Sequence, residues 1–296
     1  MWRSHWRGLL VSTVQSRPAF LVEQLQPAQK LRVVDVGANP LSPPPYQKLL
    51  EDGLCHVWGF EPQQDAYEQL LKECGPNESY FPNAVGDGRG HTLYVSPHSG
   101  FTSIFPFHIK GFTTFGFWRP RVRRFTEHAI DTVRLDDLEA LPQIDCLKID
   151  VQGAEKMIID NGAQKLSDAV VVIPEVRFNQ LYEGEPMFAG LDITLRDQGF
   201  MLHKFQSLST ARIGSSVKQQ IRQNTRRSHL IDGDAVYIRD MRDDDSISSE
   251  QLKKLAIFAD AVFDSPDLTC HCLDRLVQRN KIDASIVRAY ADMVAS

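Results

Sequence analysis

Short apolar runs alternate with segments of helical periodicity along most of this chain of 296 residues. The runs that predict strands lie at 32–36, 55–60, 80–85, 92–95, 144–150, 169–175, 200–205 and 235–239. The helical patterns between them lie at 43–53, 63–74, 154–161 and 186–198. Strands that alternate with helices in this way predict βαβ units and a mostly parallel sheet with helices on both faces. The predicted fold class is therefore α/β.

Composition narrows the class of protein further. Hydrophobic residues make up 42% of the chain and charged residues 24%, which is typical of a globular protein with a sizeable core. The net charge of −5 argues against a dedicated nucleic-acid-binding protein, which usually carries a basic face. The five cysteines are scattered, which favours a reducing compartment over a disulfide framework. No apolar stretch has the length of a secretory leader or a membrane span, so we expect a cytoplasmic protein.

The pattern divides the chain into three parts, which are an N-terminal arm (1–30), an α/β domain (31–240) and a helical tail (241–296). The tail carries amphipathic helical patterns at 250–263 and 282–294. We expect it to pack on the α/β domain or on a partner chain.

Two insertions interrupt the predicted domain. The first, at 96–130, is expected to be irregular and rich in phenylalanine, and it contains Trp118, Arg119, Arg121, Arg123 and Arg124. A long loop of this kind is a candidate lid over a site, although a self-packed flap or a dimer contact explains it equally well. The second, at 207–233, is polar and carries Lys218, Arg222, Arg226 and Arg227. These charges either meet an anionic group of a substrate or another subunit, or they form a solvated helix face.

Acidic residues stand where the first two predicted strands end. Asp35 is followed by Gly37 in the segment VDVGAN, and ligands of doubly wound sheets bind at this edge, where glycine allows close approach of the backbone. Glu61 ends the next strand and can accept hydrogen bonds from both hydroxyls of a ribose. A plain turn and a solvated glutamate are the structural alternatives. The GxGxxG fingerprint of dinucleotide-binding proteins is absent.

Three later strand ends carry further candidates. The small residues of NAVGD (83–87) leave room for an adenine ring, and Asp87 either accepts from its amino group or caps a turn. Asp150 ends the strand of LKIDVQGAE, and the same motif places Glu155 in a first helical turn, where the helix dipole favours it even without function. Glu175 ends the next strand. Asp150 and Glu175 could bind a divalent cation or orient a substrate hydroxyl, but we predict no metal ligand, because carboxylates at neighbouring strand ends are common without one.

The order of these motifs resembles the FkbM family of S-adenosylmethionine-dependent methyltransferases. The matching segments are VVDVGAN (33–39), GFEP (59–62), NAVGD (83–87), the small-residue loop at 99–103, TVRLDDL (132–138) and LKIDVQGAE (147–155). The chain departs from the family pattern in two places. Gln152 stands where the family usually has glutamate, and residues 40–44 read Pro-Leu-Ser-Pro-Pro where a glycine is common.

The resemblance implies a Rossmann-like methyltransferase fold with a sheet of about seven strands. It also implies methyl transfer from S-adenosylmethionine, mostly to hydroxyl oxygens of sugars or natural products. The implied cofactor-binding residues are Asp35, Gly37, Ala38 and Asn39 at the methionine end, Glu61 and Pro62 at the ribose, Asn83, Ala84 and Val85 at the adenine, and Asp150 between cofactor and acceptor.

A neutral alcohol must lose a proton when it is methylated, which requires a base or a metal. The candidates for the base are Asp150, His98, His108, His128 and His203, and we predict a catalytic role for Asp150, His108 and Glu175. The predicted partner is a small-molecule or glycan acceptor, with a homodimer left open. A nicotinamide-dependent oxidoreductase and a non-catalytic scaffold that keeps the fold are the alternative functions.

Overall fold

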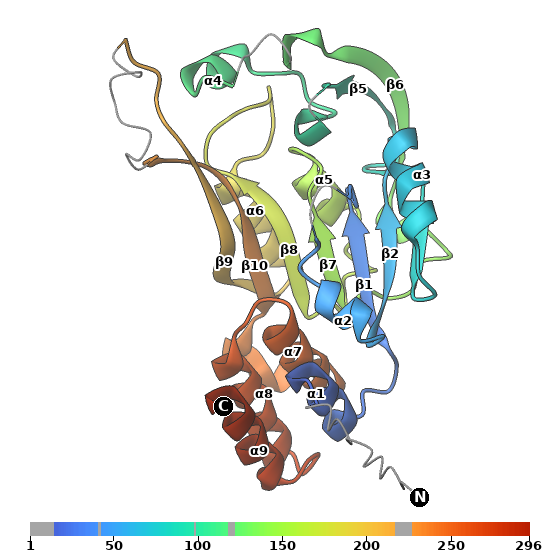
Figure 1. Cartoon of the computed structure of the whole chain (residues 1–296), viewed down its shortest axis with the longest axis vertical. Coiled ribbons are helices and arrows are strands. Elements are labelled where there is room, and N and C mark those ends of the chain that lie inside the picture. Colours follow the sequence, from blue (N-terminus) through green and yellow to red (C-terminus); the bar gives the residue numbers. More distant parts are fainter. Residues whose placement is uncertain (1–14, 41–42, 98, 118–121, 217–226) are drawn as a thin grey trace, which may run out of the picture.

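A seven-stranded sheet forms the centre of the protein (Figure 1). The computed structural model of the chain describes residues 15–40, 43–97, 99–117, 122–216 and 227–296. The strands of the sheet are β1 (Leu31–Val36), β2 (Cys55–Phe60), β3 (Glu78–Phe81), β7 (Cys146–Ile149), β8 (Val171–Arg177), β9 (Phe200–Ala211) and β10 (His229–Arg239). They follow the order β3-β2-β1-β7-β8-β10-β9, and only β10 runs antiparallel to its neighbours. The predicted α/β class with a mostly parallel sheet is confirmed.

Helices cover both faces of this sheet. They are α2 (Gln47–Glu51), α3 (Gln64–Glu73), α5 (Glu155–Asp160) and α6 (Phe188–Asp197). Alternate residues of β1 point to opposite faces, so Val33 joins the core beneath α2 while Val34 joins the core beneath α5 and α6. Because both faces are buried, the central strands are almost continuously apolar, which is the pattern that made them recognisable in the sequence.

The chain reverses its direction of travel across the sheet between β1 and β7. From β1 it first proceeds to β2 and β3 on one side, and it later returns to form β7 on the other side of β1. Such a switch point leaves a crevice at the carboxyl ends of the strands, where doubly wound proteins bind their ligands. Asp35 of β1 pairs in register with Gly59 of β2 and with Lys148 of β7. The predicted motifs therefore meet at this edge.

A smaller layer lies above the carboxyl edge of the sheet in Figure 1. It contains a three-stranded sheet of order β4-β6-β5, together with short helices and 3-10 turns that precede β7 along the chain. Its elements are β4 (Ala84–Val85), β5 (Gly90–Val95), η1 (Ser99–Phe101), α4 (Ile109–Thr114), η2 (Val122–Arg124), β6 (Thr126–Val133) and η3 (Leu135–Asp137). The expectation of an irregular segment at 96–130 is thus wrong for α4 and for β6. Most side chains of β6 are exposed, so the strand has no apolar face that the sequence could reveal.

Both ends of the predicted polar insertion at 207–233 continue strands of the sheet. β9 extends to Ala211 and β10 begins at His229, and the two form a long antiparallel hairpin. Lys218, Arg222 and Arg226 lie outside the described residues, as do His98, Trp118, Arg119 and Arg121 of the first insertion.

Four helices pack together at the amino end of the parallel strands, opposite the crevice (Figure 1). They are α1 (Arg17–Leu25), α7 (Ser249–Ala261), α8 (Pro266–Gln278) and α9 (Ala284–Ala295), with η4 (Met241–Ser246) leading into α7. Helix α1 contacts α7 and α9, so the N-terminal arm joins the tail in one bundle. The two predicted tail helices are confirmed, and α8 is an addition. Within the described residues, no helix is both long and apolar enough to cross a bilayer.

Candidate functional site

A cavity of about 980 Å³ lies at the carboxyl ends of β1, β2 and β7. Its walls come from the turns that follow these strands, from β4 and from the loop before α4. All of the residues predicted to bind the cofactor line it, namely Asp35, Gly37, Ala38, Asn39, Glu61, Pro62, Asn83, Ala84, Val85 and Asp150. Asp87 is not among the lining residues, and its carboxylate instead accepts hydrogen bonds from His91 and from the backbone N–H of Arg89.

The turn after β1 is closed against the turn after β7 at Gly37. The φ of Gly37 is +82°, and a Cβ built there would lie 2.0 Å from the carbonyl oxygen of Asp150. The backbone N–H of Asp150 donates to the carbonyl of Val36 at 3.0 Å, which holds the two turns together. Glycine is therefore required here both for the backbone conformation and for space.

Asp35 is held by two buried partners at the floor of the cavity. The hydroxyl of Tyr46 donates to Asp35 Oδ2 at 2.6 Å, and Lys148 Nζ lies 3.2 Å from Oδ1. Burial lowers the pKa of Lys148, but the carboxylates of Asp35 and Asp150 outweigh it, so this pKa is raised and the ammonium stays charged. Neither partner was predicted. A signal for Lys148 existed, because it precedes Asp150 by two residues in β7 and so points to the same side of the sheet.

Glu61 is a buried carboxylate that lines the same cavity. Glu61 is 2% exposed, and its Oε1 accepts a hydrogen bond from the backbone N–H of Gln63 at 2.8 Å. Burial raises the pKa of Glu61 against the opposing effect of this hydrogen bond. A carboxylate in such a position binds hydroxyl donors strongly, because water competes little with them.

Gln152 connects Asp150 to Glu175, which comes from the neighbouring strand. Its Nε2 donates to Asp150 Oδ1 at 3.0 Å and to Glu175 Oε2 at 2.8 Å. Its Oε1 accepts from Arg177 Nη2 at 2.6 Å and from the hydroxyl of Tyr182 at 3.0 Å. Arginine and tyrosine are both donors here, so the orientation of the amide is fixed. Gln152 also has a left-handed backbone with φ of 59°, which is unusual for a residue other than glycine.

Arg177 is the buried cation beneath this network. Its guanidinium pairs with Glu175 at 2.6 Å, with Asp232 at 2.7 Å and with Glu185 at 3.6 Å. Burial raises the pKa of Glu175 well above its ordinary value, although Arg177 opposes this shift. Glu175 is not among the residues that line the cavity, and its contact with Asp150 passes through Gln152.

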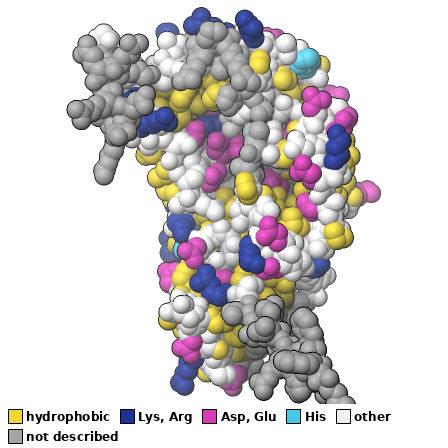
Figure 2. Space-filling view, in the orientation of Figure 1, with side chains coloured by type: hydrophobic (Ala, Val, Ile, Leu, Met, Phe, Trp, Pro, Cys, Tyr) yellow, Lys and Arg dark blue, Asp and Glu magenta, His cyan; other side chains and the backbone are white. Residues whose placement is uncertain are grey.

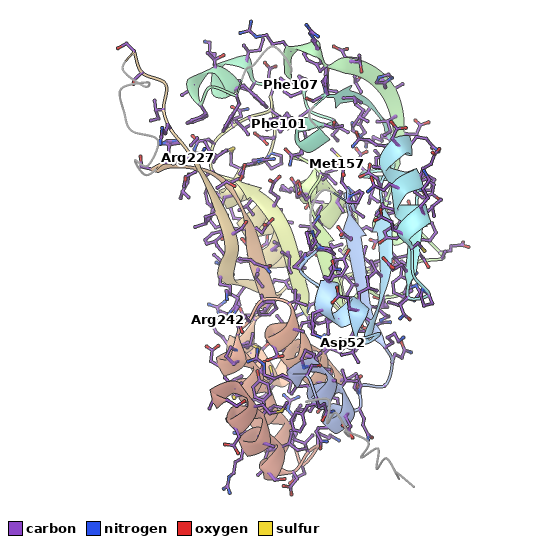
Figure 3. All side chains as sticks on the ribbon, viewed as in Figure 1. Asp52, Phe101, Phe107, Met157, Arg227 and Arg242 are labelled. Carbon is purple, nitrogen blue, oxygen red and sulfur yellow. The ribbon has the colours of Figure 1, made fainter. Side chains whose placement is uncertain are left out.

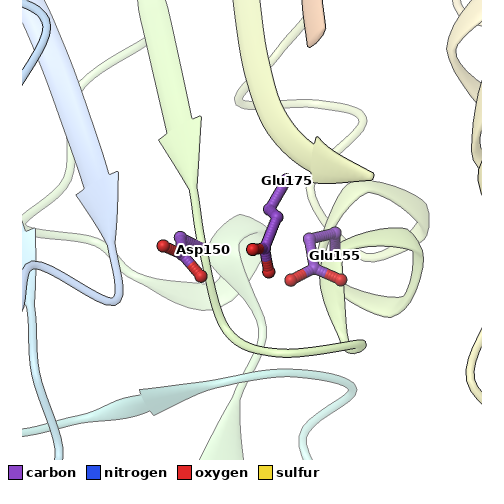
Figure 4. A group of neighbouring side chains, drawn as sticks. All are labelled: Asp150, Glu155 and Glu175. Carbon is purple, nitrogen blue, oxygen red and sulfur yellow. The ribbon is translucent and has the colours of Figure 1, made fainter. Parts of the chain in front are cut away.

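Asp150, Glu155 and Glu175 form the one group of possible metal ligands within the described residues, with carboxylate oxygens within 4.8 Å of one another (Figure 4). The Glu155 carboxylate accepts hydrogen bonds from the backbone N–H groups of Val151 and Gly153, in the turn that precedes α5. The amide N–H of Gln152 is shared by the other two carboxylates. The guanidinium of Arg177, which pairs with Glu175 at 2.6 Å, supplies a positive charge beside the group.

Of the histidines considered as bases, the three that the structure describes are not among the residues that line the cavity. His108 caps α4, where its Nδ1 accepts from the N–H of Gly111 at 3.2 Å. His128 is exposed on β6, and His203 contacts Ser265 of the helical bundle. Of the candidate bases that the structure describes, Asp150 is the one that lines the cavity.

The aromatic side chains of the first insertion pack on one another and on Tyr182. Ring centroids of Phe107 and Phe112 lie 5.6 and 5.8 Å from that of Tyr182, and Figure 3 labels Phe101 and Phe107 in the layer above the sheet. Because the Tyr182 hydroxyl also donates to Gln152, this aromatic cluster supports the network around Asp150.

The family model described as the methyltransferase FkbM domain matches residues 35–202, more than half of the chain. The chain belongs to the FkbM methyltransferase family. The protein is therefore a methyltransferase, and S-adenosylmethionine is the methyl donor expected for it. The matched segment of this FkbM methyltransferase begins at Asp35 and includes every residue that we predict at the site.

Similar solved structures include a precorrin-6y C5,15-methyltransferase from Geobacter metallireducens GS-15, with 14% identity, a TM-score of 0.34, and coverage of 75% of this chain and 87% of that one. The 16S rRNA (adenine(1408)-N(1))-methyltransferase from Catenulisporales acidiphilia has 12% identity, a TM-score of 0.33, and coverage of 76% and 94%. The StiE O-MT has 8% identity, a TM-score of 0.37, and coverage of 80% and 78%. Scores this low carry no argument about substrate. Comparison of this chain with curated proteins found no match.

Proposed function

We propose that this FkbM methyltransferase transfers a methyl group from S-adenosylmethionine to a hydroxyl oxygen of a sugar, glycan or natural-product acceptor. The observation that carries the proposal is the single cavity that Asp35, Glu61 and Asp150 line together. We further propose a small acceptor rather than a nucleic acid, and a cytoplasmic location. The net charge of −5 and the five free thiols support these two proposals.

The residues present suit the cofactor. Asp35, Gly37, Ala38 and Asn39 would hold its methionine end, Glu61 and Pro62 its ribose, and Asn83, Ala84 and Val85 its adenine. The buried carboxylate of Glu61 offers oxygens to a ribose diol, and the small side chains after β3 leave an apolar slot beside Phe60. The bound cofactor supplies a methyl group that is already strongly electrophilic, so positioning of the acceptor supplies much of the acceleration.

Asp150 is the proposed general base. An ionised carboxylate can only accept hydrogen bonds, so Asp150 can hold the acceptor hydroxyl and take its proton as the new C–O bond forms. Gln152 fixes one of the two oxygens of Asp150 through its amide N–H. The other carboxylate oxygen remains for the acceptor. Glu175 and Arg177 would then act by positioning Gln152, and no role in the chemistry is assigned to His108.

The test of the cofactor site is Glu61→Gln, which keeps the size of the side chain and removes its charge. Loss of a charge-assisted hydrogen bond to the ribose should weaken binding of S-adenosylmethionine about 10- to 100-fold in calorimetry. Glu127→Gln, at an exposed position on β6, is the matched control and should bind as tightly as the wild type.

Absence of binding in the wild-type protein would overturn the proposed function. Tight binding of NADH instead would favour an oxidoreductase. Cofactor binding without methyl transfer to any of a broad panel of hydroxylated acceptors would favour a scaffold.

A further inference from the structure

Besides Asp150 and the other residues proposed to bind the cofactor, the wall of the cavity contains the carboxylate of Asp234 in β10. Asp234 stands directly opposite Glu175 in the antiparallel pairing of β10 with β8. The hydroxyl of Ser207 donates to Asp234 Oδ2 at 2.6 Å, which fixes the direction of the carboxylate. Asp234 is thus an ordered acidic group in the part of the cavity where Asp150 would meet the acceptor.

Among the described residues, the charge of Asp234 is balanced only in part, by Lys148, which itself pairs with Asp35. Like charges directly opposite each other on neighbouring strands destabilise a sheet. Glu175 is compensated by Arg177 at 2.6 Å, whereas no lysine or arginine among the described residues forms an ion pair with Asp234. Burial raises the pKa of Asp234, and the carboxylate of Asp150 adds to this shift, whereas the hydrogen bond from Ser207 and the charge of Lys148 oppose it. A cation from outside the protein would relieve this repulsion.

The cavity as a whole has the same sign of charge. The acidic side chains among its described lining residues are Asp35, Glu51, Glu61, Glu73, Glu78, Asp150 and Asp234. Lys148 is the one basic side chain in that described set, and it is engaged with Asp35 at 3.2 Å. Figure 2 shows acidic side chains gathered over the upper ends of β8 and β10. Such a surface repels phosphate and carboxylate groups and attracts cations.

We propose that the acceptor carries a protonated amino group, which binds Asp234 while a neighbouring hydroxyl of the same molecule is presented to Asp150. The acceptor class is therefore an amino sugar or another amino alcohol, and this inference rests on the proposed function. The pairing also decides which atom is methylated. An ammonium nitrogen has no lone pair and cannot accept a methyl group, whereas the hydroxyl oxygen forms the new C–O bond and gives its proton to Asp150.

The test compares matched compounds that differ in one group. Glucosamine, N-acetylglucosamine, glucose and glucuronate are titrated into the full-length protein in the presence of S-adenosylhomocysteine, and a 2-deoxystreptamine and inositol pair is measured in the same way. We expect each amine to bind about 10-fold more tightly than its neutral counterpart, as a charge-assisted hydrogen bond provides. Glucuronate should bind most weakly of the four sugars.

Asp234→Asn should reduce the preference for the amine to within about twofold, while the affinity for glucose stays within a similar factor. Glu127→Gln removes the same charge from an exposed strand and should keep the wild-type preference. The proposal is overturned if no amine binds, if glucuronate or glucose binds as tightly as glucosamine, or if Asp234→Asn keeps the preference. Cofactor calorimetry on the same samples separates this failure from a failure of the proposed function, because Asp234→Asn should bind S-adenosylmethionine normally.

Discussion

At the scale of single residues, the backbone at Gly37 packs so closely against the carbonyl oxygen of Asp150 that no side chain fits between them. Gly37→Ala adds a methyl group 2.0 Å from that oxygen and also strains a backbone with φ of +82°. Gly184→Ala is the matched control, because Gly184 has φ of +80° but its added methyl group would meet no atom within 4 Å. Urea unfolding should show a cost of about 1 kcal/mol for the control and about 3 kcal/mol or more for Gly37→Ala. Equal costs would mean that the two turns are not in contact.

A second prediction at this scale concerns Glu185 and pH. Burial raises the pKa of its carboxyl from 4.5 to about 7, although N–H groups of Tyr182 and Leu181 donate to it. Between these two values the folded protein holds a proton that the unfolded chain has released. The free energy of unfolding should therefore fall, by about 3 kcal/mol, as pH rises through this window.

The measurement is urea unfolding from pH 4.5 to pH 7.5 on the wild type and on Glu185→Gln, which cannot titrate. The variant should lack this part of the slope, whereas Glu183→Gln, at an exposed neighbouring position, should keep it. A wild-type slope that persists in Glu185→Gln would assign the proton to another group.

Part of the site could be predicted from the types of its residues and their order in the sequence. Asp35, Glu61 and Asp150 could be predicted because each follows an apolar run, and parallel strands bring their ends to one edge. The bridge through Gln152 could not be predicted, since it depends on Arg177 and Tyr182, which come from another strand and from a loop. The position of His108 could not be predicted either, because His108 caps α4, a short helix that the sequence pattern did not indicate.

At the scale of elements, prediction was most complete for the strands that are buried on both faces, although the partly exposed β5 was also predicted, at 92–95. The central strands were recognised because both of their faces are apolar. β6 was missed because most of it is exposed, and the outer half of β9 was missed for the same reason. Helix α8 carried usable signals, because Pro266 stands in its first turn and Leu268, Cys272 and Leu276 recur at helical spacing.

Helix α7 is attached to the sheet by a buried ion pair. Asp145, at the start of β7, is fully buried and is held by Arg32 at 2.7 Å and by Lys254 of α7 at 2.8 Å. Lys254→Met keeps the apolar stem but leaves Asp145 with one cation, and should lower the free energy of unfolding by about 2–3 kcal/mol.

The control for this change is Lys253→Met, which removes the neighbouring charge, its partly exposed pairing with Glu250 at 3.4 Å and its hydrogen bond to the carbonyl of Gln26 at 3.3 Å. It should cost less than about 1 kcal/mol in urea unfolding. Equal losses in the two variants would show that the contact between Lys254 and Asp145 does not stabilise the docking of α7.

At the scale of the whole molecule, one hydrophobic core runs from the sheet into the helical bundle. Val33, Val57 and Val236 of the sheet share this core with Leu255 and Phe258 of α7. The division into arm, domain and tail, which the sequence suggested, remains a description of the chain rather than of independent folding units. The cavity lies at the opposite end of the strands from the bundle.

The contact of α1 with α7 and α9 also has a consequence during biosynthesis. Helix α1 leaves the ribosome early, whereas α7 and α9, which it contacts, follow much later in the chain. Until these helices have been translated, we expect Leu21 and Leu25, which are buried in the folded protein, to lack part of their packing. A product truncated before α7 should therefore expose part of the apolar face of α1 to chaperones.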